Sequence, residues 1–453
     1  MTQAVMARQL PMPPGPRGDF LLGSAREFTR SWPGHMENCA REYGDVVFYR
    51  FLHVPICQLT HPDHIEEVLV RNAANFCKSR DYGALKFILG NGLLTNEGAS
   101  WQKQRQLIQP AFRHENIAVY AGIMADSAAR HLARWTDGEK RDLHHEMAEL
   151  TLDIVSKSLF GTKVAHDARG IGEEIAAVME RFQTQAALAF VLPDRFPIPK
   201  SLRLLRSKKK LDEVVISIIR ERRANRTNGD DLLQRLLDAQ DESGRRMSDE
   251  QLRDEIMTLF LAGHETTANA LTWTWYLLAQ NPEVERRLAA ELEGALAGRT
   301  PTLADLPRLP YVEMVTKESM RLYPPAWGIG RRALKDFEVG GYRIPAGTNI
   351  FIVQWMTQRD ARFFPEPERF DPERWREDPV RKGKIPRFAY FPFGGGPRVC
   401  IGAGFAMMEA TLLLATIAQR YRFTLASEAK VEPLFSVTLR PKHGLPMTLH
   451  RRT

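Results

Sequence analysis

The chain has 453 residues, of which 43% are hydrophobic and 26% are charged, so it can bury a large core and is neither disordered nor of low complexity. Four cysteines are too few for a disulfide framework at this length, and the N-terminal stretch has no apolar run typical of a membrane anchor or signal peptide. The formal net charge is +8, but no nucleic-acid-binding motif accompanies the basic runs. We therefore expect a cytoplasmic, monomeric protein that does not bind nucleic acid.

The first part of the chain mixes strands with short helices. Residues 1–20 are rich in proline, which predicts a stiff, exposed lead. Residues 45–60 are rich in Val, Ile, Phe and Tyr and alternate in polarity, which predicts a β-hairpin, and residues 61–72 predict a short helix. From about 101 to 300 the apolar residues recur at helical spacing, with breaks rich in Pro or Gly such as 191–200.

One long helix is expected in the middle of the chain. Ser248 and Gln251 have the spacing of a capping box, and Asn281 with Pro282 marks the end of the helix. At 1.5 Å per residue this helix spans roughly 50 Å, enough to cross a domain. Its centre is almost free of charge, so we expect it to be buried.

The C-terminal part alternates between regular and irregular segments. Residues 311–323 predict a helix that ends at two prolines, and a β segment follows with its turn at Gly340 and Gly341. An irregular stretch, 357–399, leads to the last cysteine. A final helix is expected from about Ile401.

The segment "FGGGPRVCIG", residues 393–402, surrounds Cys400 with glycines and one arginine. The positive end of the following helix favours a thiolate over a thiol. Glycines permit tight backbone turns and let a flat, bulky cofactor approach the chain, and Arg398 could reach a carboxylate of that cofactor. A single thiolate of this kind suits a nucleophile or a metal ligand. Zinc is disfavoured, because no second Cys or His lies at ligand spacing.

Phe393, Gly396, Arg398, Cys400 and Gly402 match the F-x-x-G-x-R-x-C-x-G haem-binding loop of the cytochrome P-450 superfamily, which the chain therefore resembles. The resemblance implies that the Cys400 thiolate is the axial ligand of iron in haem b. It also implies that the loop glycines, Gly394 and Gly402 among them, fit beneath the porphyrin while Arg398 meets a haem propionate.

The resemblance runs in order over roughly residues 12 to 440. It implies a single domain over 1–453, mainly α with a small β-rich lobe (α+β), with haem between the long central helix and the helix after the cysteine loop. The short N-terminal lead suggests a bacterial-type member without a membrane anchor.

A second motif, "AGHETTA" at 262–268, lies on the long helix. A zinc-peptidase H-E-x-x-H motif is excluded, because position 268 is alanine. Ala262 and Gly263 leave room beside the helix axis, and Thr266 can donate its hydroxyl to the Ala262 carbonyl and widen the helix there. The segment resembles the family's A-G-x-E-T-T motif, which implies Thr266 as the alcohol that delivers protons and Glu265 as its acidic partner.

Glu318 and Arg321 lie three residues apart on one helix face, a spacing that by itself indicates a weak surface pair. It resembles the family's E-x-x-R, which implies a buried network with an arginine from the segment before the cysteine loop. Two candidates occur in "PERFDPERW", and the spacing to the cysteine favours Arg374 over Arg369. This is a structural site.

The stretch "WQKQR", 101–105, resembles the family's W-x-x-x-R helix, which implies that Trp101 and Arg105 contact haem propionates. Arg331 matches a further propionate arginine, with Arg332 as the adjacent alternative. Two buried carboxylates need such cationic partners.

The resemblance implies a haem-thiolate monooxygenase, an oxidoreductase that inserts one oxygen atom from O₂ into an apolar substrate. The alternatives are a peroxygenase or an O₂-independent rearrangement enzyme, and a haem-binding sensor or carrier without turnover. The Glu265–Thr266 pair favours O₂ activation.

Substrate contacts are expected in 82–94, around Phe260 to Ala262, at 326–329 and near 435–437. The expected pocket is apolar and suits fatty acids, terpenoids or steroids. Its candidate residues are Leu85, Phe87, Ile88, Leu94, Phe260, Trp327 and Val437.

Only 53 residues follow Cys400, so we expect electrons, ultimately from NAD(P)H, to arrive through a separate ferredoxin or flavodoxin with its reductase. The partner is expected to dock on the cysteine side, because opposite charges steer acidic redox proteins to basic surfaces. The basic residues expected there are Arg381, Lys382, Lys384, Arg387, Arg398 and Lys103.

Overall fold

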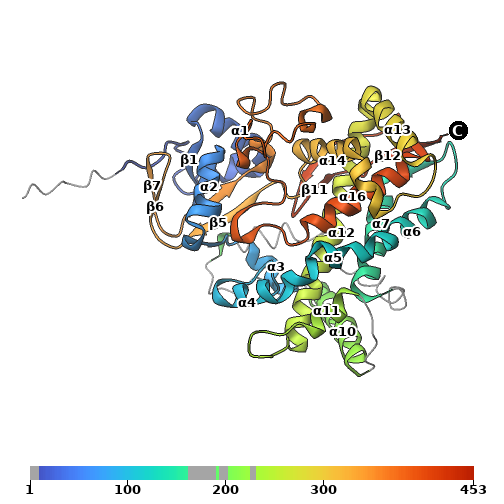
Figure 1. Cartoon of the computed structure of the whole chain (residues 1–453). Coiled ribbons are helices and arrows are strands. Elements are labelled where there is room, and N and C mark those ends of the chain that lie inside the picture. The colour runs from blue at the N-terminus through green and yellow to red at the C-terminus, as the bar shows by residue number, and fades with distance from the viewer. Residues whose placement is uncertain (1–9, 162–189, 193–201, 225–230, 453) are drawn as a thin grey trace, which may run out of the picture.

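The computed structural model describes residues 10–161, 190–192, 202–224 and 231–452. Helices make up most of the molecule, and a small β-rich part lies to one side of them (Figure 1). This confirms the predicted mainly α fold with a β-rich lobe. None of the helices in the described ranges is long and apolar enough to cross a membrane.

The helices follow one another along nearly the whole described chain. They are α1 (Ala25–Tyr43), α2 (Pro62–Glu66), α3 (Tyr82–Leu89), α4 (Gly98–Ile108), α5 (His114–Ile117), α6 (Ala121–Leu132), α7 (Leu143–Phe160), α10 (Leu202–Ala224), α11 (Leu232–Asp238), α12 (Asp249–Gln280), α13 (Pro282–Leu296), α14 (Pro310–Leu322), α15 (Gln354–Thr357) and α16 (Ala403–Ala418).

The β-rich lobe is built around a five-stranded sheet with the order β1-β2-β8-β5-β3. Its strands are β1 (Val46–Phe51), β2 (Val54–Leu59), β3 (Phe76–Lys78), β5 (Ile329–Ala333) and β8 (Asn349–Ile352). The predicted hairpin over 45–60 is the β1–β2 pair. Because β5 and β8 come from far along the chain, the lobe closes only when the C-terminal half folds onto it.

The remaining strands form smaller sheets. They are β4 (Lys140–Asp142), β6 (Phe337–Val339), β7 (Tyr342–Ile344), β9 (Tyr421–Leu425), β10 (Pro433–Phe435), β11 (Leu439–Pro441) and β12 (Pro446–Arg451). The expected turn at Gly340 and Gly341 joins β6 to β7, and both glycines have positive φ. The strand β4 pairs with β12, which also pairs with β9.

The described part of the proline-rich lead, residues 10–20, is largely exposed as expected, but its middle is packed against the lobe. Pro13 is buried, and the Pro14 carbonyl accepts a hydrogen bond from the Phe48 N–H (2.9 Å). A Cβ on Gly15 would overlap the Phe48 carbonyl. The composition indicated that this segment is stiff, but it did not indicate that the segment packs against strand β1. Residues 1–9 of the lead lie outside the described ranges.

Helix α12 passes through the middle of the fold, where it contacts α16 on one side and α10 and α11 on another (Figure 1). Its boundaries follow the predicted signals: Ser248 accepts from the Gln251 N–H (3.2 Å), and Asn281 caps the other end. Side chains before and after its centre are buried, including Ile256 and Trp273 at 0% exposure. The predicted long central helix is confirmed, and it is buried on both sides of its centre but not at the centre itself, residues 262–266.

Helix α7 packs closely along α12. A Cβ on Gly263 would lie only 3.2 Å from the Val155 side chain, so the absence of a side chain allows this approach. The Thr151 hydroxyl donates to the His264 carbonyl across the interface (3.1 Å). Gly263 therefore serves helix packing, which corrects the expectation that it leaves room beside the helix axis.

A buried ionic network on α14 ties the helical core to the segment before the cysteine loop. Glu318 and Arg321 are both 0% exposed and form two hydrogen bonds of 2.8 Å. The Arg374 guanidinium donates to Glu318 (3.3 Å), and the Trp375 indole N–H donates to the same carboxylate (2.9 Å). The side chain of Arg369 instead pairs with exposed Glu366. The geometry therefore agrees with Arg374 as the network arginine.

We predict that Arg374→Ala lowers the free energy of unfolding by about 1–3 kcal/mol, because it leaves a buried carboxylate short of a charged donor. Arg369→Ala is the matched control, and it should change stability by less than about 1 kcal/mol, because its ion pair is exposed. Denaturant unfolding of the two variants measures the difference. Equal losses would contradict the assignment of Arg374 to the network.

Candidate active site

The loop before α16 presents Cys400 on a tightly folded backbone. The Cys400 N–H donates to the Phe393 carbonyl (2.9 Å), and Gly394 and Gly396 have φ values of 72° and 67°. These conformations are costly for residues with a side chain. The loop therefore holds the cysteine in one place through its own backbone.

The loop glycines fall into two groups. A Cβ on Gly395 would overlap the Phe388 ring, and one on Gly396 would overlap the Leu69 carbonyl, so these two allow the loop to seat against the protein. Gly394 and Gly402 have only distant neighbours, at 3.5 and 3.9 Å from the position of a Cβ. Of these four glycines, only Gly394 and Gly402 leave room for a bulky group. The expectation that the loop glycines together fit beneath a porphyrin is therefore narrowed to these two.

The helix after the loop begins at Ala403 with Gly402 as its N-cap, two residues later than expected. Burial raises the pKa of the Cys400 thiol, although the Gly402 N–H and the Arg105 guanidinium act to lower it. The protein surroundings alone therefore do not favour a thiolate, contrary to the expectation from the helix N-terminus. A bound metal cation would supply the missing stabilisation, because coordination deprotonates a thiol.

The centre of α12 exposes a short stretch between two buried ones. Ala262 is exposed, whereas Leu261 and Thr267 are only 6% and 3% exposed. The Thr266 hydroxyl donates to the Ala262 carbonyl (2.6 Å), which is the expected bond, and the helix continues through this point without interruption. Because both flanks are buried, the exposed stretch faces the interior of the fold.

Basic side chains gather between the β-rich lobe and the cysteine loop. Lys78 on β3 and Arg331 on β5 are directly paired across the two strands. Arg398 forms an ion pair with Glu97, donates to the Asn96 carbonyl (2.8 Å) and lies over the Trp101 ring at 4.0 Å.

Arg105 donates to the Val399 carbonyl (3.0 Å), next to Cys400 in the loop. Arg331 is 8% exposed, whereas Arg332 is half-buried and lies opposite Cys77 in the strand register, so of the two adjacent arginines Arg331 joins the basic cluster.

The electrostatics of this cluster indicate a missing anion. Burial lowers the pKa of Lys78 well below its usual value, and the positive charges of Arg331 and Arg398 lower it further, although the Glu97 and Asp81 carboxylates act to raise it. Burial also lowers the pKa of both arginines. Buried cations need anionic partners, so this arrangement fits a ligand that carries carboxylates.

Three of these side chains keep exposed surface although burial dominates their pKa shifts: Lys78 and Arg398 are half-buried and Cys400 is exposed. A side chain has both properties when the surface it exposes faces an enclosed space. The residues present therefore fit a flat, anionic group held between the cysteine loop and the β-rich lobe.

Sequence reasoning missed two ionisable residues, Lys78 in the cation cluster and Glu409 in the core near α12. Lys78 joins the cations only through the β3–β5 register, which a sequence pattern does not reveal. Glu409 on α16 is 1% exposed, and burial raises its pKa to about 8, while a hydrogen bond with Thr267 acts to lower it. The sequence signal for Glu409 is a single carboxyl within a helix of small and apolar residues.

The expected pocket residues separate by burial. Leu85, Ile88 and Phe260 are at most 6% exposed and belong to one apolar core cluster, in which Phe260 lies near the Phe160 ring. Phe87, Leu94, Trp327 and Val437 are half-buried. Substrate contact by any of these residues stays a prediction.

The basic surface expected on the cysteine side is smaller than its sequence suggests. Lys382 and Lys384 both form ion pairs with Glu377, and Arg398 is held inside by Glu97. Arg381, Arg387 and Lys103 are exposed, and within the described part of the chain no ion pair is found for them.

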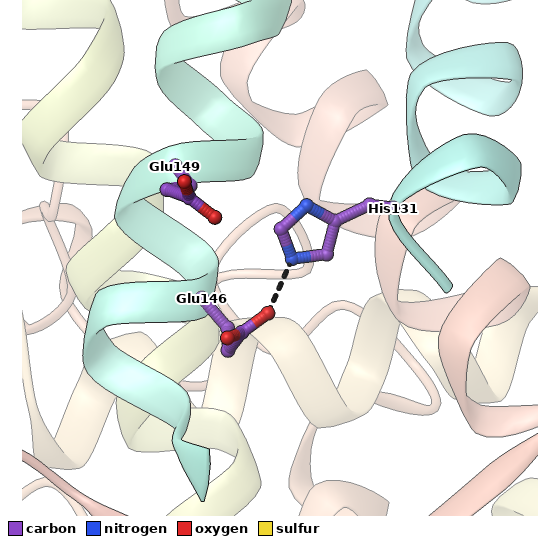
Figure 2. Close-up of side chains that lie close together, drawn as sticks. All are labelled: His131, Glu146 and Glu149. Atoms are coloured by element: carbon purple, nitrogen blue, oxygen red, sulfur yellow. Dashed lines mark hydrogen bonds and ion pairs between the residues drawn. The ribbon is translucent and has the colours of Figure 1, made fainter. Parts of the chain in front are cut away.

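A second group of possible metal ligands lies between α6 and α7, away from the cysteine loop in sequence. It consists of His131, Glu146 and Glu149 (Figure 2). The His131 ring nitrogen lies 2.7 Å from Glu146, which also accepts from Trp135 (2.8 Å) and Arg141 (2.9 Å). Burial acts to raise the pKa of Glu146, but these donors hold it at about 2. Since the lone pairs of Glu146 are taken by donors, we interpret the cluster as a structural junction between the two helices.

Comparisons with known proteins agree with this geometry. Residues 13–446 match the sequence model of the family described as Cytochrome P450. The chain is 38% identical to cyclooctatin synthase from Streptomyces melanosporofaciens over 93% of its own length and 90% of that protein. It is 33% identical to pentalenene oxygenase from Streptomyces avermitilis over 96% of both.

A solved structure extends the comparison to three dimensions. The fold is similar to that of retinoic acid-bound cyanobacterial CYP120A1, with a TM-score of 0.87, 26% identity and coverage of 98% of this chain and 100% of that one. The cysteine loop, the motif on α12 and the buried ionic network thus occur in an overall fold and a sequence that match the same family. The chain belongs to the cytochrome P450 family of haem-thiolate monooxygenases.

Proposed function

We propose that this protein hydroxylates or otherwise oxygenates an apolar terpenoid, with Cys400 as the axial ligand of its haem iron. The observation that carries the proposal is the exposed Cys400 thiol on a rigid loop beside a cluster of buried cations. When bound, the haem supplies the activation of O₂, in which one oxygen atom enters the substrate and two electrons and two protons reduce the other to water.

The protein's own residues hold the cofactor from two directions. Cys400 would bind the iron through sulfur, and Gly394 and Gly402 leave space where other residues would carry side chains. Arg331, Arg398 and Lys78 would neutralise the propionates. The Trp101 ring packs against the Arg398 guanidinium, and Arg105 donates to the loop backbone next to the cysteine.

The exposed stretch of α12 provides proton transfer. Ala262 leaves space for small molecules, and its carbonyl holds the Thr266 hydroxyl in place (2.6 Å). Thr266 delivers protons in the active site, and Glu265, whose pKa is raised by burial, supplies them.

The proposed substrate class is supported by the residues proposed to line the pocket and by the names of similar proteins. The proposed pocket residues Leu94, Phe87, Trp327 and Val437 are apolar and half-buried, and they offer no charged anchor. Two relatives carry the names of terpenoids, cyclooctatin and pentalenene, and the structural neighbour binds retinoic acid. This supports a terpenoid over a fatty acid or a steroid.

We predict that cyclic terpenoid hydrocarbons and alcohols convert the haem spectrum of the purified protein to the substrate-bound form and are oxygenated with one atom from ¹⁸O₂. A panel of fatty acids and steroids of similar size is the control and should produce weaker shifts. Mass spectrometry of the products measures incorporation. Oxygen derived from water, or turnover confined to fatty acids, would contradict the proposal.

Electron delivery is proposed to use a separate acidic ferredoxin or flavodoxin that receives its electrons from NAD(P)H through a reductase. The docking surface is proposed around Arg381, Arg387 and Lys103, because these three of the six basic residues expected there are exposed and form no ion pair within the described part of the chain. Attraction of this kind speeds encounter and weakens with salt.

We predict that Arg381→Glu with Arg387→Glu slows reduction by the ferredoxin about tenfold or more at low salt. The matched control is Lys382→Glu with Lys384→Glu, which should have a smaller effect because Glu377 already neutralises that pair. Stopped-flow reduction at several salt concentrations measures both, while peroxide-driven turnover should be nearly unchanged. A rate independent of charge and salt would place the partner elsewhere.

A further inference from the structure

One face of α12 is bonded to the loop between β10 and β11. Glu265, Asn269 and Trp273 are spaced four residues apart and therefore lie on the same face of the helix. The Trp273 indole donates to the Leu439 carbonyl (3.0 Å), and both other side chains meet Thr438. The β10–β11 loop is thus fixed to the same helix that carries the proposed proton-delivery residues.

The bonds at Thr438 have a defined direction. The Asn269 amide N–H donates to the Thr438 hydroxyl oxygen (3.0 Å), so the hydroxyl hydrogen is available to donate to Glu265 (2.6 Å). The Asn269 carbonyl oxygen lies 3.2 Å from the His144 Nε2, which donates to it in the tautomer that carries a hydrogen there. A chain of donors therefore runs from half-buried His144 to the Glu265 carboxyl.

This chain is enclosed, which makes each of its bonds consequential. Thr438 is 5% exposed and Asn269 is 0% exposed. A buried polar group that loses its partner incurs the full cost of desolvation, and bonds in a chain strengthen one another. The Glu265 carboxyl is therefore held in one orientation by a residue that lies 173 positions further along the sequence.

The charged and titratable groups around the chain come from four elements, β4, α7, α12 and β11. Burial raises the pKa of Glu265, while the Thr438 hydroxyl and the Arg440 guanidinium on β11 act to lower it. Burial also lowers the pKa of His144, which has Asp142, His145 and Arg440 as charged or titratable neighbours and His264 close by on α12.

We propose that Thr438 is a positioning residue for proton delivery: its hydroxyl, oriented by Asn269 and His144, holds the carboxyl of Glu265, the residue before Thr266 on α12, in one orientation. This inference rests on the proposed role of Glu265 as the acidic partner of Thr266. Because Val437 precedes Thr438 in the same loop, the segment proposed to contact the substrate also holds the proton source.

The first test measures the carboxyl itself. Infrared difference spectra of the haem-loaded protein are recorded across pH, and the Glu265 band is identified by its loss in Glu265→Gln. Removing a donor to the charged form raises a carboxyl pKa, so Thr438→Val should shift the titration upward by about one to two units. Thr438→Ser keeps the hydroxyl and should titrate close to the unchanged protein. An unshifted titration in Thr438→Val would overturn the inference.

The second test measures coupling, the ratio of product to electrons consumed. Thr438→Val should lower coupling and increase hydrogen peroxide, with a pH dependence displaced in the same direction as the carboxyl titration, and Thr438→Ser should restore both. Haem content should stay unchanged in both variants, whereas the unfolding temperature should fall only in Thr438→Val, because the Asn269 amide loses its acceptor there. A serine variant as impaired as the valine variant would show that the methyl packing matters rather than the hydroxyl.

The two tests separate this inference from the function on which it rests. A shifted titration with unchanged coupling would contradict the role of Glu265 in proton delivery, and the inference with it. An unshifted titration would contradict the inference alone. If Thr438→Val does not fold, Asn269→Leu removes the donor that orients the hydroxyl and should displace the titration in the same direction by a smaller amount.

Discussion

Positive charge buried beside the cysteine loop is the constraint on which the rest of this structure depends. Lys78, Arg331 and Arg398 come from two strands and a loop, and Glu97 forms an ion pair with Arg398. Removing a charge from water costs several kcal/mol unless a partner compensates for it. The arrangement is therefore complete only with an anionic ligand, and that ligand would bridge the β-rich lobe and the helical core.

The central helix joins this site to the C-terminal hairpin. Its exposed stretch at Ala262 faces the interior, whereas the face with Glu265, Asn269 and Trp273 holds the β10–β11 loop. The same helix thus separates two tasks: one side leaves room for reactants, and another orients the group that supplies protons. Gly263 makes this possible because it lets α7 pack close to α12.

Features set by local sequence were predictable. The Thr266 bond joins residues four apart, the ends of α12 carry their own capping residues, and the spacing to the cysteine distinguished Arg374 from Arg369. Features set by distant pairing were not. Lys78 is paired with Arg331, which lies far along the chain, and no periodicity or motif brings those two together.

The wrong expectations share the same physical origin. Arg398 was expected both at a haem propionate and on the docking surface, but its ion pair with Glu97 leaves it half-buried, and Lys382 and Lys384 form ion pairs with Glu377. The loop glycines were expected to serve the cofactor, but two of them serve contacts with Phe388 and Leu69. In each case the position of the residue depends on a contacting residue that the local sequence does not identify.

The central claim is that Cys400 binds haem iron through sulfur, and the spectrum of the reduced protein with carbon monoxide tests it most directly. The account predicts a strongly red-shifted Soret band, its loss in Cys400→Ser, and its retention in the control variant Cys77→Ser. A band typical of an imidazole ligand, or a red-shifted band that persists in Cys400→Ser, would contradict the account.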